Sequence, residues 1–210
     1  MVMDKINIHY SPRSHLGLSE IGHKCDRYIY NVHNNVPCMR PDERLLRIFK
    51  LGNAIEDLII EDLRTAYDVF DCQKEIFIEH NGSLIKGHID GIIYINNIPH
   101  LLEIKSASKS RFNQLKKCGY EEWSETYKAQ IHTYCTICEL SKIFVIVYNK
   151  DNSDIYEEFI DLNISYAIDV MKRAISIIGV RQRPKMLCPN AGFYRAKMCK
   201  FQEECFKNVG

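Results

Sequence analysis

Two carboxylates and a lysine occupy one short stretch of the sequence, Ile85–Ser106. Asp90 lies in its first half, and Glu103 and Lys105 stand two positions apart near its end. Like charges a few ångströms apart repel by about 1 kcal/mol in water and by several times more in a drier site. A Mg²⁺ ion relieves such repulsion, because it takes one or two carboxylates together with waters and phosphate oxygens. Asp90 and Glu103 are therefore candidate metal ligands, with Lys105 beside them to hold or deprotonate an attacking water.

The same three residues also fit a hairpin whose charges merely face solvent. Such triplets are common, and for this triplet alone the solvent-facing interpretation is favoured. The choice between the two depends on the elements that position the side chains and on further residues elsewhere in the chain.

Two short apolar runs joined by a polar turn would bring these side chains together. Leu84 to Ile95 is the first run, Asn96-Asn97 is the turn, and His100 to Lys105 is the second run. Alternating apolar and polar residues around an Asn-rich turn predict a β-hairpin. Because side chains two apart on a strand face the same way, Glu103 and Lys105 share one face and Leu102 and Ile104 the other.

Hydrophobic periodicity predicts the other elements. Helices are expected from about Ser14 or Ser19 through Asn31 with Cys25 in the middle, from Pro41 to about Leu63, over Glu121–Leu140, and over Ile164–Gly179. Strands are expected at Val69–Ile78, Ser141–Tyr148 and Ile155–Ile160, the second of them central and buried.

Two helices carry further polar candidates. Glu56 follows Gly52 by one helical turn on the same face. A glycine inside a helix costs up to about 1 kcal/mol relative to alanine. A backbone or phosphate that approaches closely at Gly52 would explain its presence there. A solvated surface carboxylate is the alternative for Glu56. Gln130 and Tyr134 lie four residues apart on one face of a later helix.

The net charge of +1 over 210 residues does not indicate nucleic acid for the chain as a whole. Phosphates would have to meet a local basic patch, and the candidate DNA-binding side chains are Lys109, Arg111, Lys116, Lys117 and Lys150. An exposed loop and helix is the alternative for this stretch. The length suits one domain with an extension.

No apolar run reaches the roughly 20 residues needed to span a membrane. The N-terminal residues lack the apolar core of a signal peptide, so we expect a cytoplasmic protein with reduced thiols. Nine cysteines then raise the question of metal ligation. For Cys135 and Cys138, which are spaced as Cys-x-x-Cys inside a predicted helix, we favour an ordinary core role over a redox or zinc role.

Taken together and in order, four motifs resemble the PD-(D/E)XK nuclease superfamily, and more narrowly its RecB-type exonuclease branch. They are Gly52-x-x-x-Glu56, Gly87-His88-Ile89-Asp90, Glu103-Ile104-Lys105 and Gln130-x-x-x-Tyr134. One cysteine near the N-terminus and three in the C-terminal region are similar to the iron–sulfur members, which include the AddB nuclease domain and CRISPR-associated RecB-like exonucleases, with relatives in phages.

The resemblance implies an α/β fold with a PD-(D/E)XK restriction-endonuclease-like core, in which helices flank a mixed central sheet. It implies one nuclease domain over 1–210, made of an N-terminal helical region (1–40), a core (41–180) and a cysteine-containing tail (181–210). It also implies a metal-dependent DNA exonuclease that acts on single-stranded DNA or DNA ends. A structure-specific or flap endonuclease, or a catalytically silent DNA-binding adaptor, are the alternatives.

The resemblance also assigns site residues. Asp90, Glu103 and the Ile104 carbonyl would hold Mg²⁺ or Mn²⁺, and so would Glu56, which stands where many relatives have histidine. Lys105 would act on the water, and Gln130 and Tyr134 would position Lys105 or the DNA strand.

The cofactor implied for the cysteines is a structural [4Fe–4S] cluster on Cys25, Cys188, Cys199 and Cys205. Ala196 stands where relatives often have one of these cysteines, so Cys188 must supply that ligand, and zinc or no metal are the alternatives. The partners implied are DNA and a separate helicase or recombination or adaptation protein. The oligomeric state is left open.

Overall fold

A five-stranded mixed sheet forms the centre of the computed structural model, which describes residues 15–207. The strand order is β1 (Val69–Phe70), β4 (Gly91–Ile95), β5 (Ile98–Ala107), β6 (Lys142–Asn149) and β7 (Ile155–Asp161). β5 and β6 run parallel, and the other neighbours are antiparallel. The predicted α/β class with a mixed central sheet is confirmed, and so is the central, buried strand after Ser141.

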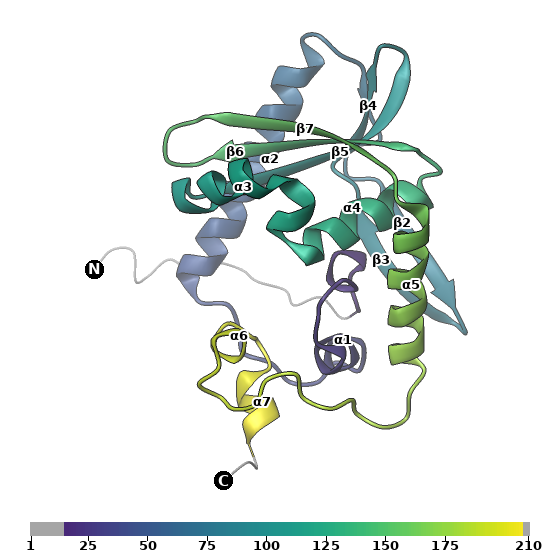
Figure 1. Ribbon diagram of the computed structural model, residues 1–210, viewed down its shortest axis with the longest axis vertical. Coiled ribbons are helices and arrows are strands. Elements are labelled where there is room, and N and C mark those ends of the chain that lie inside the picture. Colours follow the sequence, from purple (N-terminus) through teal and green to yellow (C-terminus); the bar gives the residue numbers. More distant parts are fainter. Residues whose placement is uncertain (1–14, 208–210) are drawn as a thin grey trace.

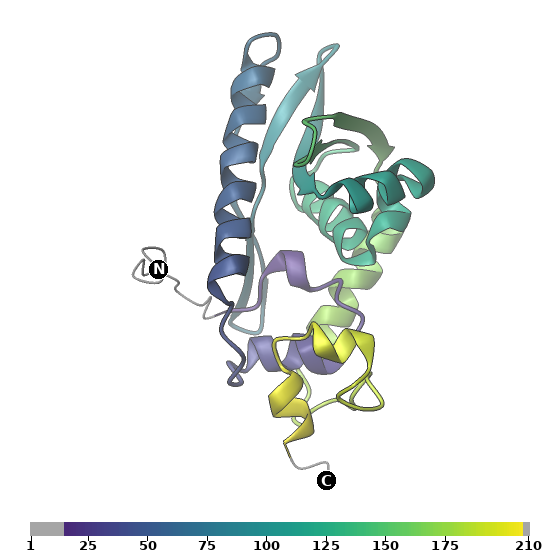
Figure 2. The ribbon, with the colours of Figure 1, turned by 90° about the vertical axis from the view of Figure 1, so that its left-hand side faces the viewer.

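Helices cover both faces of this sheet (Figures 1 and 2). The long helix α2 (Glu43–Arg64) lies on one face, and α3 (Lys109–Trp123) and α4 (Glu125–Ile137) lie on the other, with α5 (Ile164–Ile178) packed against α4. Leu102 and Ile104 belong to the apolar cluster beneath α2. Glu103 and Lys105 therefore face the α3–α4 side, as the strand alternation predicts.

The predicted hairpin is confirmed as β4 and β5, which pair from Gly91 with Leu102 to Ile95 with Ile98. Its turn residues Asn96 and Asn97 have positive φ values of 51° and 63°. Two consecutive positive φ values match the twist of paired strands, and asparagine tolerates them well. The run that precedes the hairpin is interrupted at Ile89 and Asp90, because β3 (Ser83–His88) ends just before them.

The strand predicted over Val69–Ile78 is wrong as a single element. β1 ends at Phe70 and β2 begins at Glu75 (Glu75–His80), because Asp71 and Gln73 between them take positive φ values of 52° and 57°. β2 then pairs with β3 in a separate two-stranded sheet.

α2 begins where the sequence predicts it. Asp42 caps its first turn by accepting a hydrogen bond from the Leu45 amide at 2.7 Å. The helix predicted over Glu121–Leu140 is in fact α4 preceded by the end of α3, with the break at Ser124. Ser124 has an extended backbone and its hydroxyl caps α4 by accepting from the Tyr127 amide, so the two helices can change direction there.

The prediction for the N-terminal helix is wrong at Cys25. A short 3₁₀ turn (Leu18–Glu20) precedes α1 (Asp26–His33), and Cys25 is the extended residue before α1, not a mid-helix residue. Gly22, in the turn between these two elements, passes so close to α4 that a Cβ there would collide with Ala129. The predicted range 1–40 also includes residues 1–14, which lie outside the described part of the chain.

The C-terminal tail folds back beside α1 (Figures 1 and 2). It contains two short helices, α6 (Tyr194–Lys197) and α7 (Gln202–Phe206). Hydrogen bonds join it to the N-terminal region, among them Arg27 Nε to the Pro184 carbonyl at 2.6 Å and Arg183 Nε to Asn31 Oδ1 at 2.9 Å. The Met39 amide also donates to the Lys200 carbonyl at 2.8 Å. Residues 208–210 of the predicted tail lie outside the described range.

Candidate active site

The start of the β4–β5 hairpin gathers the predicted acid–lysine cluster. Asp90 immediately precedes β4, and its Oδ2 accepts a hydrogen bond from the Ile104 amide at 2.7 Å. Glu103 lies on β5 and is fully buried, with 0% of its surface exposed. The Lys105 ammonium forms an ion pair with Glu103 and also donates to the Ile104 carbonyl at 3.3 Å. The chain thus brings Asp90, Glu103 and Lys105 together.

Burial and mutual repulsion set the charge of this cluster. The pKa of Glu103 is raised to about 7, chiefly by burial and also by the negative charges of Asp90 and Glu56, against the opposing effect of Lys105. Burial likewise raises the pKa of Asp90. The pKa of Lys105 is raised by Glu103 and Asp90, although burial alone would lower it. Carboxylates that resist ionisation beside a charged lysine form a site that a cation would stabilise.

Glu56 reaches the same cluster from α2. Burial raises its pKa to about 7, and the charge of Asp90 adds to this effect. The Gln73 side chain donates a hydrogen bond to Glu56. Gln73 was missed by sequence reasoning, because it stands in the loop between β1 and β2, where spacing carries no information about a partner on α2. A cavity of about 380 Å³ opens here and is lined by Glu56, Asp57, Ile60, Glu61, Arg64, Cys72 and Gln73.

α4 supplies Gln130 and Tyr134 to this side of the sheet. Gln130 Nε2 donates to Glu103 Oε2 at 3.3 Å, so in this structure Gln130 contacts the ion-pair partner of Lys105. Tyr134 is buried in the apolar core, with its hydroxyl against Gly87 of β3. Tyr134 therefore packs behind the cluster.

Two aromatic residues not predicted as site residues also border the cluster. The Tyr127 ring lies 5.7 Å from Lys105 Nζ. Tyr120 is fully buried beside it, with the two rings stacked at 6.1 Å. In the sequence, Tyr120 is marked only by its position three residues after the basic stretch that ends at Lys117.

The predicted DNA-binding side chains fall mainly on α3. Lys109, Arg111, Lys116 and Lys117 are all exposed there, and Lys150 is half-buried in the turn after β6. α3 begins two residues after β5 ends, so this basic face starts next to the strand that carries Glu103 and Lys105. Arg111 lies over the Trp123 ring at 4.8 Å.

The four cysteines predicted to bind a cluster meet where α1 and the tail come together. Burial raises the pKa of Cys199, and the charges of Cys205, Cys25 and Cys188 add to it, so the four thiols lie within electrostatic reach of one another. All nine cysteines are free of disulfide bonds. Cys135 is a buried core residue whose pKa is raised by burial to about 12, which fits an unreactive structural role.

Donor chemistry supports the metals implied by the resemblance. Carboxylate and carbonyl oxygens suit Mg²⁺ or Mn²⁺, and four neighbouring thiols suit iron–sulfur or zinc. In their present positions, however, no three His, Cys, Asp or Glu side chains within residues 15–207 are grouped to hold a metal ion. A metal ion at Glu103 would compete with the ion pair that Lys105 makes with this carboxylate.

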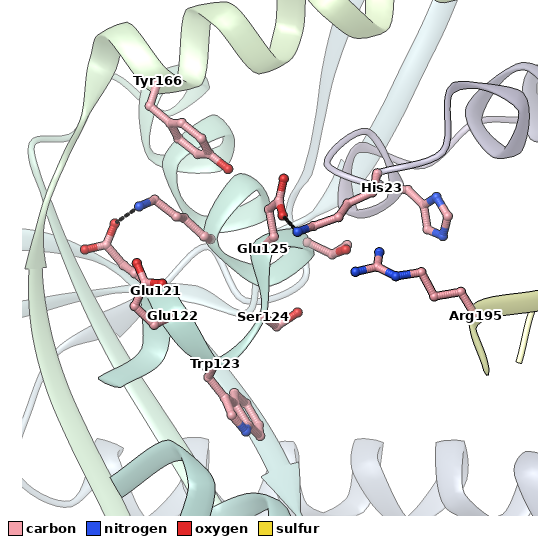
Figure 3. Close-up of a pocket in the computed structure, with 11 residues that line it drawn as sticks. His23, Glu121, Glu122, Trp123, Ser124, Glu125, Tyr166 and Arg195 are labelled. Carbon is pink, nitrogen blue, oxygen red and sulfur yellow. Dashed lines mark ion pairs between the residues drawn. The ribbon is translucent and has the colours of Figure 1, made fainter. Parts of the chain in front are cut away.

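A second, larger cavity of about 560 Å³ lies at the α3–α4 junction, between α5 and the tail (Figure 3). Its basic and acidic side chains are largely paired, Lys24 with Glu125 and Lys128 with Glu121. Arg195 extends into it from the tail (Figure 3). This balance of charge makes the cavity a poor match for a phosphate, and the acid–lysine cluster is the better candidate for chemistry. None of the helices within residues 15–207 has the length and apolar character to cross a membrane.

Comparison with known proteins relates the fold to solved structures. No family model and no curated protein matches the sequence. The crystal structure of SSO0001 is similar at a TM-score of 0.55 and 18% identity, over 94% of this chain and 88% of that one. The alkaline exonuclease LHK-Exo from Laribacter hongkongensis is similar at a TM-score of 0.55 and 13% identity, over 79% and 86%.

A structure of LHK-Exo in complex with dAMP is similar at a TM-score of 0.56 and 11% identity, with the same coverage of 79% and 86%. At these identities the likeness concerns the fold. The chain therefore shares its fold with SSO0001 and with an alkaline exonuclease.

Proposed function

We propose that this protein is a metal-dependent deoxyribonuclease, and that it acts as an exonuclease on single-stranded DNA or DNA ends. The observation that carries the proposal is the buried cluster of Asp90, Glu103 and Lys105, in which burial raises the pKa values of both carboxyl groups. A surface hairpin with solvated charges, the alternative interpretation of these residues, would not bury Glu103 completely. The shared fold with an alkaline exonuclease adds independent support.

Each residue has a distinct role in this proposal. Asp90, Glu103, the Ile104 carbonyl and Glu56 would hold Mg²⁺ or Mn²⁺, which when bound lowers the pKa of water and neutralises charge on the phosphate. Lys105 orients the attacking water once it has released Glu103. Gln130 holds one oxygen of Glu103 by its hydrogen bond. The exposed basic face of α3 binds the DNA backbone.

The tail cysteines carry the second part of the proposal. Cys25, Cys188, Cys199 and Cys205 would bind a structural [4Fe–4S] cluster that joins α1 to the tail. Their mutual electrostatic effects and the hydrogen bonds between the tail and α1 support this ligand set. Zinc on the same thiolates is the competing cofactor. The protein would work in the cytoplasm, together with a separate helicase or recombination or adaptation protein.

Cleavage of defined DNA substrates decides the proposed activity. End-labelled linear single-stranded and duplex DNA and circular single-stranded DNA are incubated with Mg²⁺ or Mn²⁺. We expect linear DNA to shorten from an end, circles to survive, and Asp90→Ala to be inactive. Asp57→Ala is the matched control, because Asp57 is exposed on α2 one residue from Glu56.

Other outcomes point to the alternatives. Cutting of circles would establish the endonuclease, and Asp90→Ala would still have to abolish it. DNA binding without any cleavage, by protein that is folded and carries its cofactor, would establish the DNA-binding adaptor.

A further inference from the structure

A buried tyrosine hydroxyl lies beneath the acid cluster without a partner. Tyr120 has 0% of its surface exposed, and its hydroxyl has no hydrogen-bond partner of full geometry within residues 15–207. Buried polar groups are nearly always hydrogen-bonded, so an orphaned hydroxyl calls for an explanation. Glu103 Oε1, which takes the ion pair with Lys105, is likewise without a hydrogen bond of full geometry.

The two orphaned groups lie in one region of the core, because the Tyr120 ring stacks on Tyr127 at 6.1 Å and the Tyr127 ring lies 5.7 Å from Lys105 Nζ, the ion-pair partner of Glu103. After burial, the negative charge of Glu103 is the largest influence that raises the pKa of Tyr120, and Tyr127 and Asp90 follow. The Tyr120 hydroxyl therefore lies near the Glu103 carboxylate but makes no hydrogen bond to it in this structure.

The backbone around Tyr120 fixes this position. Gly119 takes a φ of +75° and kinks α3, which turns the next residue inward. The Tyr120 amide then donates to Glu158 Oε2 of β7 at 2.8 Å. The ring is held by Tyr127 and by Trp123, at ring-centre distances of 6.1 Å and 5.9 Å. A residue placed this firmly has little freedom to find another acceptor.

We propose that Tyr120 is a positioning residue of the active site, whose hydroxyl donates a hydrogen bond to Glu103 and orients that carboxylate when Lys105 releases it. Three elements then direct donors at one carboxylate: β5 through Lys105, α4 through Gln130 and α3 through Tyr120. Lys105 leaves Glu103 to act on the attacking water, so Gln130 and Tyr120 are the donors that remain directed at the Glu103 carboxylate. The reaction in this statement rests on the proposed function, whereas the pairing of Tyr120 with Glu103 does not.

Tyr120→Phe removes the hydroxyl and keeps the ring. The matched control is Tyr156→Phe, because the Tyr156 hydroxyl donates to Glu158, the same carboxylate that accepts from the Tyr120 amide. For each variant we would measure Mn²⁺ binding from the electron paramagnetic resonance signal of the free ion, the melting temperature without metal, and kcat and KM for DNA cleavage.

We expect Tyr120→Phe to bind Mn²⁺ about 10-fold more weakly than the unaltered chain, as is typical when a partner of a metal ligand is lost. Its kcat should fall while KM for DNA stays the same, because Tyr120 has no exposed surface that could contact DNA. The melting temperature without metal should not decrease, because the hydroxyl is unsatisfied in that state. Tyr156→Phe should keep its Mn²⁺ affinity.

Unchanged Mn²⁺ affinity in Tyr120→Phe would overturn the proposal, and a lower melting temperature alongside it would assign Tyr120 a purely structural role. Weaker Mn²⁺ binding by Tyr120→Phe, with no DNA cleavage by any chain, would keep the pairing with Glu103 and remove the nuclease function. Absence of Mn²⁺ binding by the unaltered chain would overturn the positioning role, and cleavage with and without a chelator would then decide the nuclease function separately.

Discussion

The hydroxyl oxygen of Tyr134 on α4 lies 2.5 Å from the point that a Cβ on Gly87 of β3 would occupy. Leu18 Cβ lies 3.0 Å from the same point. An added methyl group would have to displace a buried tyrosine, and such overpacking costs about 1–3 kcal/mol. We expect Gly87→Ala to lower the free energy of unfolding by this amount, measured by urea denaturation.

Gly52→Ala provides the matched comparison for this prediction. No described atom lies within 4 Å of a Cβ on Gly52, which stands inside α2. Alanine should therefore raise the free energy of unfolding by up to about 1 kcal/mol through helix propensity. Adding Tyr134→Phe to Gly87→Ala should restore part of the lost stability. If the free energy of unfolding of Gly87→Ala is no lower than that of Gly52→Ala, β3 can move away from Tyr134 freely.

Glu56→Gln should change how stability depends on pH. The pKa of Glu56 is raised to about 7 in the folded chain, against an ordinary value of 4.5. Between these values the unfolded chain releases its proton first, so metal-free protein loses stability as pH rises from about 4.5 to about 7. Glutamine removes this loss. The variant should melt higher than the unaltered chain at pH 8 and at the same temperature at pH 4.

Asp62→Asn is the control for this pH series, because it removes another exposed carboxylate from the same helix. Melting curves would be recorded by circular dichroism in the presence of a chelator. If Glu56→Gln and the unaltered chain lose stability in parallel from pH 4 to pH 8, the acid cluster does not include Glu56.

Cys199→Ser should remove the bound cofactor. If the four tail cysteines hold a [4Fe–4S] cluster, purified protein is brown and absorbs broadly near ~400 nm, and loss of one thiolate ligand removes this absorbance. Cys118→Ser is the control, because Cys118 is exposed on α3. Metal analysis by mass spectrometry accompanies the spectra. A colourless protein with one zinc per chain would replace the cluster by a zinc site.

Lys116→Gln combined with Lys117→Gln should weaken DNA binding. The logarithm of the affinity falls as the logarithm of the salt concentration rises, and each lost phosphate contact makes this slope shallower by about 0.7 on single-stranded DNA. Affinities would be measured by fluorescence anisotropy in the Asp90→Ala background, so that the probe stays intact. Lys172→Gln with Lys207→Gln removes two exposed lysines elsewhere and serves as the control. Equal salt-dependence slopes for the two double variants would show that Lys116 and Lys117 of α3 do not contact the DNA backbone.

Local signals account for what the sequence predicts well. The β4–β5 hairpin follows from alternation and from two asparagines in the turn, and these signals also fix Glu103 and Lys105 on one face. The start of α2 follows from the capping residue Asp42. Each signal spans a few residues and survives in the folded chain, because the tertiary contacts agree with it.

Contacts between distant segments account for what the sequence does not predict. The turn before α1 brings Gly22 against Ala129 of α4, about a hundred residues later, and no pattern near Gly22 reveals this contact. The partner of Gln130 is Glu103, which lies 27 residues earlier. Tyr120 is buried beside the acid cluster, directly after the kink that Gly119 makes in α3. Periodicity predicts which face of an element a residue lies on, but its contact partner on another element depends on how the elements pack.

The pairing of α1 with the tail orders events during synthesis. Asn31 on α1 is completely buried, and its side-chain oxygen is satisfied by Arg183, which the ribosome adds about 150 residues later. Until Arg183 emerges from the ribosome, the side-chain oxygen of Asn31 on α1 lacks its hydrogen-bond donor. A translation product that stops before this point would leave the buried Asn31 side chain without its hydrogen-bond partner, so the ordering of α1 is tied to the synthesis of the tail.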